Sequence, residues 1–437
     1  MIPTRYPLAC GGELSVCHTD KFKAGMLSVS LVLPIDPQKA WLTSLLLSVL
    51  RRGTERYPTL AAINRRLDYL YGTELSIRNF YRGDCRIVGF SADLLGSVVL
   101  PDGEDLPAGV VDVMCQILFH PILDENGLLD ARYVESEKIQ HCDNIRALKN
   151  SPRSYASDRC RALLYQNEPC GASIYGTVEE VMAVTPKELT EHWHRLLRDV
   201  RFSCFYVGAE PAEQIKAALE KAFEREGLGG TELAGRLWLP QVVRSADKVL
   251  SDEEPLAVGQ SQLVLAWRTG ITMLDPDYCA CAVMNEMLGN SPISKLFVQV
   301  RERLSLCYFC SSHYNAYKST LTVHCGLDAK DEALAKREIL AQLQAIANGE
   351  FTKKELDAAK CSICNAYEQI QDVPAALESF YFGRSLLGVR DTADAMCRRF
   401  ASVGRKEVIA AAKKLTLQVV YFLRGTLVSG EDDDEEN

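Results

Sequence analysis

The sequence predicts an α+β protein built from two similar halves. The order strand, apolar helix, glycine, second helix and two further strands occurs at 26–92 and returns at 262–325 of the 437 residues. Between these blocks the apolar periodicity stops, and a glycine-rich stretch at 225–246 indicates an interdomain linker. Two α+β domains joined by a linker are therefore expected.

The boundaries of the predicted domains follow from this linker. The first domain covers 1–224, the second covers 247–429, and an acidic tail at 430–437 is expected to be solvated and disordered.

The elements of the first half follow from local patterns. Met26 to Leu33 reads as a strand, and the apolar run that starts at Trp41 reads as a buried helix, with arginines in its last turn and Gly53 as its stop. Thr59 is a candidate N-cap for the next helix. The alternating segments 75–81 and 85–92 then predict a hairpin. Further helices are expected at 110–118, 128–147, 154–165 and 187–197, and a closing strand at 201–207.

The second half repeats this order. A strand is expected at 262–267, helices at 278–288 and 293–304, and strands at 307–313, 319–325 and 421–423. This internal repeat is the strongest evidence for the fold.

Composition narrows the class of protein. Apolar residues at 47% and charged residues at 24% are ordinary for a soluble globular chain. The sequence has no basic stripe interleaved with aromatics, so we do not expect it to bind nucleic acid. The longest apolar run, 42–50, is too short for a membrane span, and the N-terminus lacks signal-peptide features. Sixteen cysteines in apolar segments predict buried thiols in a reducing cytoplasm.

The order strand, buried helix, Gly53-Thr54 and second helix resembles the insulinase/pitrilysin metallopeptidases, the inverzincins of H-x-x-E-H type. The resemblance extends from about Gly25 to Gly425. It implies two homologous domains, each a mixed or antiparallel sheet covered by helices, in a half-clamshell. Residues 57–59 and 67–72 carry a further similarity to bacterial proteins associated with elongation factor P 5-aminopentanol modification, the YfmF type.

In that family two histidines one helical turn apart bind zinc and a glutamate acts as the base. Counted back from Gly53-Thr54, those positions fall on Ser44, Leu47 and Ser48. The family's third ligand, a glutamate, falls on Asn144. All four are replaced by neutral side chains, so we expect no metal in this chain. A weak site at His141 and Asp143 is the alternative, although the polarity of a surface helix explains both residues better.

Ser44 and Ser48 also invite a nucleophilic role. No partner base is identifiable, and hydroxyls that bond back to helix carbonyls are the better explanation.

The second half matches a different pattern of the family, an arginine and a tyrosine. The family carries an arginine at a helix end and a tyrosine seven residues later, and Arg301 and Tyr308 fit this spacing. A guanidinium and a phenol can bind a peptide carbonyl or stabilise an oxyanion. The family's glycine between them is Ser305 here. The alternative is an arginine on a solvated helix face and a half-buried tyrosine.

Two Cys-x-x-Cys pairs, Cys307/Cys310 and Cys361/Cys364, could suggest a zinc ribbon. The first pair falls on a predicted strand, where i and i+3 side chains point to opposite faces, and the second falls within a helix. Buried thiols are therefore the preferred interpretation.

These observations lead to one functional hypothesis and two rivals. The chain is expected to be a catalytically silent subunit that binds peptide and presents Arg301 and Tyr308 to a zinc-bearing partner chain, or to a second copy of itself. Alone it is not expected to hydrolyse peptides. An adaptor of the same fold without a role in proteolysis is one rival, and an enzyme with different chemistry is the other.

Overall fold

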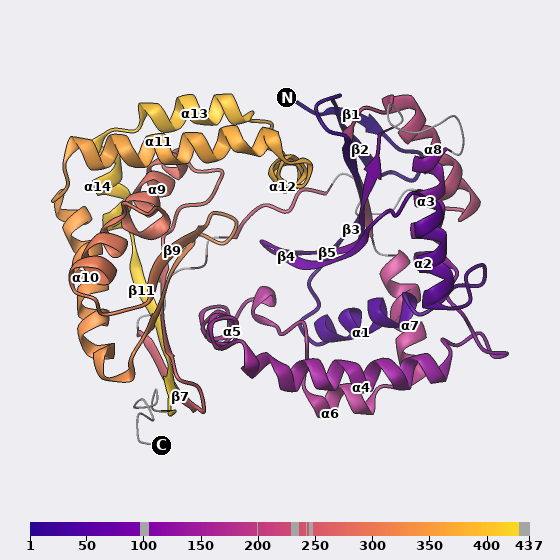
Figure 1. Cartoon of the computed structure of the whole chain (residues 1–437), viewed down its shortest axis with the longest axis horizontal. Coiled ribbons are helices and arrows are strands. Elements are labelled where there is room, and N and C mark those ends of the chain that lie inside the picture. The colour runs from indigo at the N-terminus through magenta and orange to yellow at the C-terminus, as the bar shows by residue number, and fades with distance from the viewer. Residues whose placement is uncertain (97–104, 199, 229–235, 242, 244–247, 428–437) are drawn as a thin grey trace, which may run out of the picture. The chain divides into compact units, whose positions relative to one another are not determined.

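A computed structural model describes residues 1–96, 105–198, 200–228, 236–241, 243 and 248–427. The chain forms two compact units (Figure 1). The first unit comprises Met1–Arg146, Ala172–Leu239 and Gln369–Thr392, and the second comprises Ala147–Gly171, Pro240–Glu368 and Ala393–Asn437. The predicted tail at 430–437 lies outside the described residues, as does part of the predicted linker.

The first unit is built on a six-stranded sheet. Its strands are β1 (Thr4–Pro7), β2 (Glu13–His18), β3 (Ala24–Pro34), β4 (Leu75–Arg82), β5 (Cys85–Leu95) and β6 (Arg201–Gly208). Their order across the sheet is β1-β2-β6-β3-β5-β4. The pair β2/β6 is parallel and the other pairs are antiparallel.

The second unit repeats this plan with five strands. They are β7 (Leu250–Leu256), β8 (Ser261–Arg268), β9 (Phe309–Asn315), β10 (Thr320–Leu327) and β11 (Thr416–Gly425), in the order β7-β11-β8-β10-β9. The pair β7/β11 is again parallel and the others are antiparallel. This order matches β2-β6-β3-β5-β4 strand for strand, which confirms the predicted α+β repeat.

Helices cover both sheets. The first unit holds α1 (Ala40–Leu50), α2 (Leu60–Tyr69), α3 (Leu106–Phe119), α4 (Ala131–Ala147), α6 (Val178–Ala183), α7 (Pro186–Arg198), α8 (Ala212–Arg225) and α12 (Pro374–Ser385). The second holds α5 (Pro152–Leu164), α9 (Tyr278–Asn285), α10 (Glu332–Asn348), α11 (Lys353–Gln369), α13 (Ala393–Ser402) and α14 (Arg405–Lys413). Figure 1 shows α3 and α8 side by side against their sheet.

Two of these helices belong to the unit opposite to their half of the sequence. Helix α5 packs on β8 and β11 of the second unit, where the Tyr165 hydroxyl after it lies 2.7 Å from Thr320 Oγ1. Helix α12 packs on β3 and β6 of the first unit, where Glu378 pairs with buried Arg78 at 2.7 Å. The domain boundary at 225–246 therefore stays a prediction. The compact units do not follow the two halves of the sequence strictly, because each unit includes one helix from the other half.

Helix α1 confirms the predicted buried helix but ends differently. The helix stops at Leu50 with Arg51 as its C-cap, so the arginines follow the last turn instead of lying in it. Arg52 instead forms an ion pair with Glu137 of α4. Gly53 is required by close packing, because a Cβ there would lie 2.7 Å from the Pro58 carbonyl oxygen. Thr59 caps α2 as predicted, accepting from Ala62 N at 3.1 Å.

Two predicted boundaries in the second half were wrong. The helix expected at 293–304 is a π-helix over Leu296–Arg303, preceded by another at Glu286–Asn290. The strand expected from residue 307 begins at Phe309. Within the described residues, no helix is both long and apolar enough to cross a membrane.

Helix α7 holds α1 through a buried polar contact whose strength should depend on pH. The His192 ring lies 2.9 Å from Thr43 Oγ1, and burial lowers the pKa of His192 to about 4. The unfolded chain therefore binds this proton near pH 6.5 while the folded chain does not. Stability is complete above that pH and falls as the pH drops toward 4.

We predict that His192→Gln reduces this acid sensitivity by up to about 3 kcal/mol between pH 6.5 and 4. Urea unfolding at a series of pH values measures it. His194→Gln, on the exposed side of the same helix, is the control. Parallel pH profiles for His192→Gln and the unchanged chain would contradict the prediction.

Candidate functional site

On α1, the positions of the family's two histidine ligands carry hydroxyls, and the position of its base carries an alkyl chain. Leu47 is buried in the core of the first unit. The Ser48 hydroxyl donates to the Ser44 carbonyl at 3.4 Å, as predicted for a helical serine. Ser44 Oγ instead donates to the carbonyl of Ile174, 2.6 Å away.

Ser44 is bonded to a buried arginine, Arg86, which the sequence did not suggest as a site residue. Arg86, on β5, is only 3% exposed. Its Nη2 donates to Ser44 Oγ at 3.0 Å and to Asn79 Oδ1 at 2.6 Å, and its Nη1 donates to the Ala40 carbonyl. Asn79 Nδ2 completes the set by donating to Ser44 Oγ at 2.9 Å.

This network works against a bound dication. Burial lowers the pKa of Arg86 to about 10, so the guanidinium is still charged at neutral pH. A fixed positive charge that contacts the first ligand position repels Zn²⁺, and the lone pairs of Ser44 Oγ are already engaged. Sequence offered one signal that was missed: a charged residue inside the otherwise apolar strand 85–92 needs a partner.

The third ligand position lies on the surface of α4. Asn144 is exposed and accepts from Gln140 Nε2 at 3.4 Å. Both residues of the alternative metal site have other partners, because the His141 ring bonds the Tyr175 carbonyl at 2.8 Å and Asp143 pairs with Arg146. Neither residue belongs to a cluster of three metal-ligating side chains among the described residues.

The structure brings Arg301 and Tyr308 to one pocket of the second unit. The pocket has a volume of about 440 Å³. Arg301 lies in the π-helix Leu296–Arg303, its guanidinium 4.7 Å from the Phe297 ring centroid. Tyr308 immediately precedes β9, is 60% exposed, and donates to Asp328 Oδ1 at 3.3 Å. Both groups reach solvent, and their contact with a substrate stays a prediction.

Ser305 shapes the turn between these two residues. Its φ of +49° lies in the left-handed region that favours glycine, which explains the family's preference there. The turn follows from the hydrogen bonds on either side of it, Leu304 N to the Gln299 carbonyl and Leu306 N to the Val300 carbonyl, both 3.1 Å.

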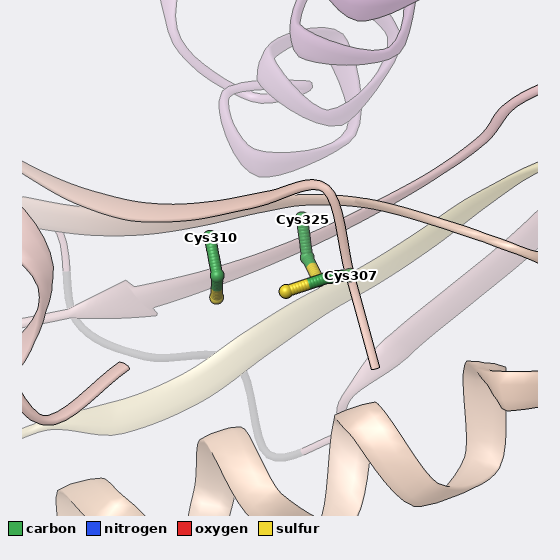
Figure 2. Close-up of side chains that lie close together, drawn as sticks. All are labelled: Cys307, Cys310 and Cys325. Atoms are coloured by element: carbon green, nitrogen blue, oxygen red, sulfur yellow. The ribbon is translucent and has the colours of Figure 1, made fainter. Parts of the chain in front are cut away.

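Three thiols meet beside this pocket, which corrects one sequence argument. Cys307 precedes β9 instead of lying on it, so the rule that i and i+3 side chains diverge on a strand does not apply. The sulfurs of Cys307, Cys310 and Cys325 lie within 4.8 Å of one another (Figure 2). Bonds from the other two thiols, helped by the charge of Arg301, hold the pKa of Cys307 below its usual range.

The second Cys-x-x-Cys pair lies within a helix as predicted, but its thiols are not buried as predicted, because this part of the helix surface faces solvent. Cys361 and Cys364 lie in α11, Cys361 is exposed, and Cys364 Sγ bonds the Cys397 carbonyl at 3.6 Å. The joining of Cys325 to Cys307 and Cys310 was missed because it depends on the register of β9 and β10, which pairs Cys325 with Cys310.

Comparison with known proteins agrees with this fold. Residues 183–362 match the family model described as the peptidase M16 inactive domain. This partial match, in a family of peptidase-like domains, confirms the predicted resemblance to the insulinase/pitrilysin group.

Individual relatives cover most of the chain. It is 28% identical to the probable inactive metalloprotease YmfF of Bacillus subtilis, over 94% of this chain and 95% of that protein. It is 25% identical to the uncharacterized zinc protease YmxG of the same organism, over 70% of this chain and 72% of the relative.

Solved structures share the fold. A conserved protein from Enterococcus faecalis superposes with a TM-score of 0.86 at 24% identity, covering 99% of this chain and 100% of the other. A peptidase M16 inactive domain from Pseudomonas fluorescens superposes with a TM-score of 0.78 at 16% identity, with the same coverage.

Restoring the ligands alone should not restore a zinc site. We predict that Ser44→His, Leu47→Glu, Ser48→His and Asn144→Glu together add no stoichiometric zinc to what the unchanged chain binds, because the Arg86 charge remains. Elemental analysis of the dialysed protein measures bound zinc. The matched control adds Arg86→Leu to the same four changes and should raise zinc uptake, provided that circular dichroism shows both variants folded. One further zinc ion per chain than the unchanged chain binds, with Arg86 intact, would refute the repulsion argument.

A glycine at position 305 should stabilise the second unit. The left-handed conformation costs a non-glycine residue about 1–2 kcal/mol, and the extra freedom of glycine in the unfolded chain offsets part of that gain. Ser305→Gly is therefore expected to add about 0.5–1 kcal/mol to the free energy of unfolding. Denaturant unfolding tests this. Ser311→Gly on β9, where φ is not positive, should destabilise instead; equal effects of the two changes would contradict the explanation.

Proposed function

We propose that the chain is a catalytically silent subunit of an insulinase-type peptidase. In this proposal it binds an extended peptide and supplies Arg301 and Tyr308 to a zinc-bearing partner chain. The observation that carries the proposal is the contrast between the two units. The positions for metal chemistry in the first unit are neutral, and the first of them, Ser44, accepts a hydrogen bond from the cation of Arg86, whereas Arg301 and Tyr308 remain exposed around one pocket.

The pocket suits a peptide backbone. A guanidinium and a phenol are donors for a carbonyl oxygen or for the oxyanion that develops from it. Strand β9 starts directly after Tyr308 and pairs only with β10 among the described strands. In this proposal a peptide strand adds to the other side of β9 and runs past Tyr308.

The partner in this proposal is a chain with an intact H-x-x-E-H motif, and a second copy of this chain is the alternative partner. The association with elongation factor P modification stays a prediction from sequence similarity.

The decisive experiment is peptide hydrolysis by this chain alone and after co-expression with an H-x-x-E-H chain of the same genome. We expect no turnover by the lone chain and turnover by the pair. Arg301→Ala and Tyr308→Phe should each lower turnover by about 100-fold, because each removes one donor to developing negative charge. Arg303→Ala, two residues away and outside the pocket, is the control and should have no effect.

Each other outcome has a definite meaning. A complex that assembles with Arg301→Ala and keeps its turnover would support an adaptor of the same fold and overturn the proposal. Hydrolysis by the lone chain that chelators abolish would refute a silent subunit.

A further inference from the structure

Three cysteine side chains converge where β9 begins and β10 ends in the second sheet. Cys310 on β9 and Cys325 on β10 are direct cross-strand partners, and Cys307 approaches from the segment before β9 (Figure 2). We call these residues the trithiol cluster. Their sulfurs all lie within 4.8 Å of one another.

This convergence exceeds what packing requires. A structural cysteine behaves as a small apolar side chain and needs no second sulfur beside it. Among the residues that the structure describes, the trithiol cluster is the only group in which three thiols come together. Two of its members belong to a Cys-x-x-Cys segment, and its third member comes from the neighbouring strand.

The spacing fits a thiophilic ion. Zinc binds thiolate sulfur at about 2.3 Å in tetrahedral geometry, which places two bound sulfurs about 3.8 Å apart. The observed sulfur–sulfur separations, all within 4.8 Å, exceed that value by at most about 1 Å. Three thiolates suit the borderline-soft Zn²⁺ better than Mg²⁺ or Ca²⁺, which prefer oxygen.

The surroundings provide access and charge balance. Cys310 and Cys325 are buried, whereas Cys307 is partly exposed and lines the pocket together with Arg301, Tyr308 and Asp328. An ion can therefore enter from the pocket. Three thiolates and one Zn²⁺ carry a net charge of −1, which the guanidinium of Arg301 can offset.

We propose that the trithiol cluster is a thiolate-bound zinc site, distinct from the family's lost catalytic site on α1. The ion would tie the turn that carries Tyr308 to the β9/β10 hairpin. Binding releases a proton from each thiol that ionises, so affinity rises with pH. The proposal does not depend on a peptidase partner.

Cadmium is the spectroscopic probe, because thiolate-to-cadmium charge transfer absorbs in the ultraviolet. We expect the fully reduced, full-length chain to develop this absorption until one Cd²⁺ is bound per chain, and Zn²⁺ to compete for the same site. Cys307→Ser, Cys310→Ser and Cys325→Ser should each abolish the stoichiometric absorption. Cys361→Ser, in the other Cys-x-x-Cys pair, should keep it.

Folding of each variant is checked by circular dichroism. Cys307 is partly exposed and outside the strands, so Cys307→Ser is the variant that decides if a change at Cys310 or Cys325 unfolds the chain. A reduced protein that shows no charge-transfer absorption would overturn the proposal, as would absorption that survives Cys307→Ser in the folded chain. A disulfide within the cluster that forms in air while the reduced protein takes up no Cd²⁺ would indicate a redox pair instead.

Discussion

The buried guanidinium of Arg86 determines what the first unit can do. It joins three elements at once, because its donors reach the Ala40 carbonyl at the start of α1, Ser44 one turn later, and Asn79 on β4. The loss of metal chemistry is therefore more than a loss of ligands. A cation with satisfied hydrogen bonds has taken the place beside the former ligand position, and a buried charge of this kind is expensive to leave unpaired.

Local patterns were sufficient to predict the repeat. Alternation in 75–81 and 85–92, the apolar run of α1 and the Thr59 cap are properties of short segments, and each appears in the structure near its predicted place. The absence of ligands at Ser44, Ser48 and Asn144 could likewise be read from spacing within one helix or from a single aligned position.

Long-range contacts could not be predicted in this way. Periodicity shows that α5 and α12 have an apolar face but does not say which sheet covers it, so the exchange of helices between the units was missed. The trithiol cluster depends on the register of β9 against β10, and the bonds of Arg86 depend on side chains from three elements. These features are set by tertiary packing, which a single sequence does not encode locally.

The two units share five strands in the same order but differ in the segment that follows α1 in the first and α9 in the second. In the second unit that segment is a π-helix and a turn with Ser305 in the left-handed region, and both are conformations that cost free energy. Such strain persists where the surrounding structure holds it, and here it places Arg301 and Tyr308 on one pocket with Cys307 between them. An ion held by Cys307 would brace the strained turn from its buried side. The same turn would then have to place two donors, Arg301 and Tyr308, at the pocket and the thiolate of Cys307 at the ion. The left-handed conformation of Ser305 is the part of the turn on which both placements depend.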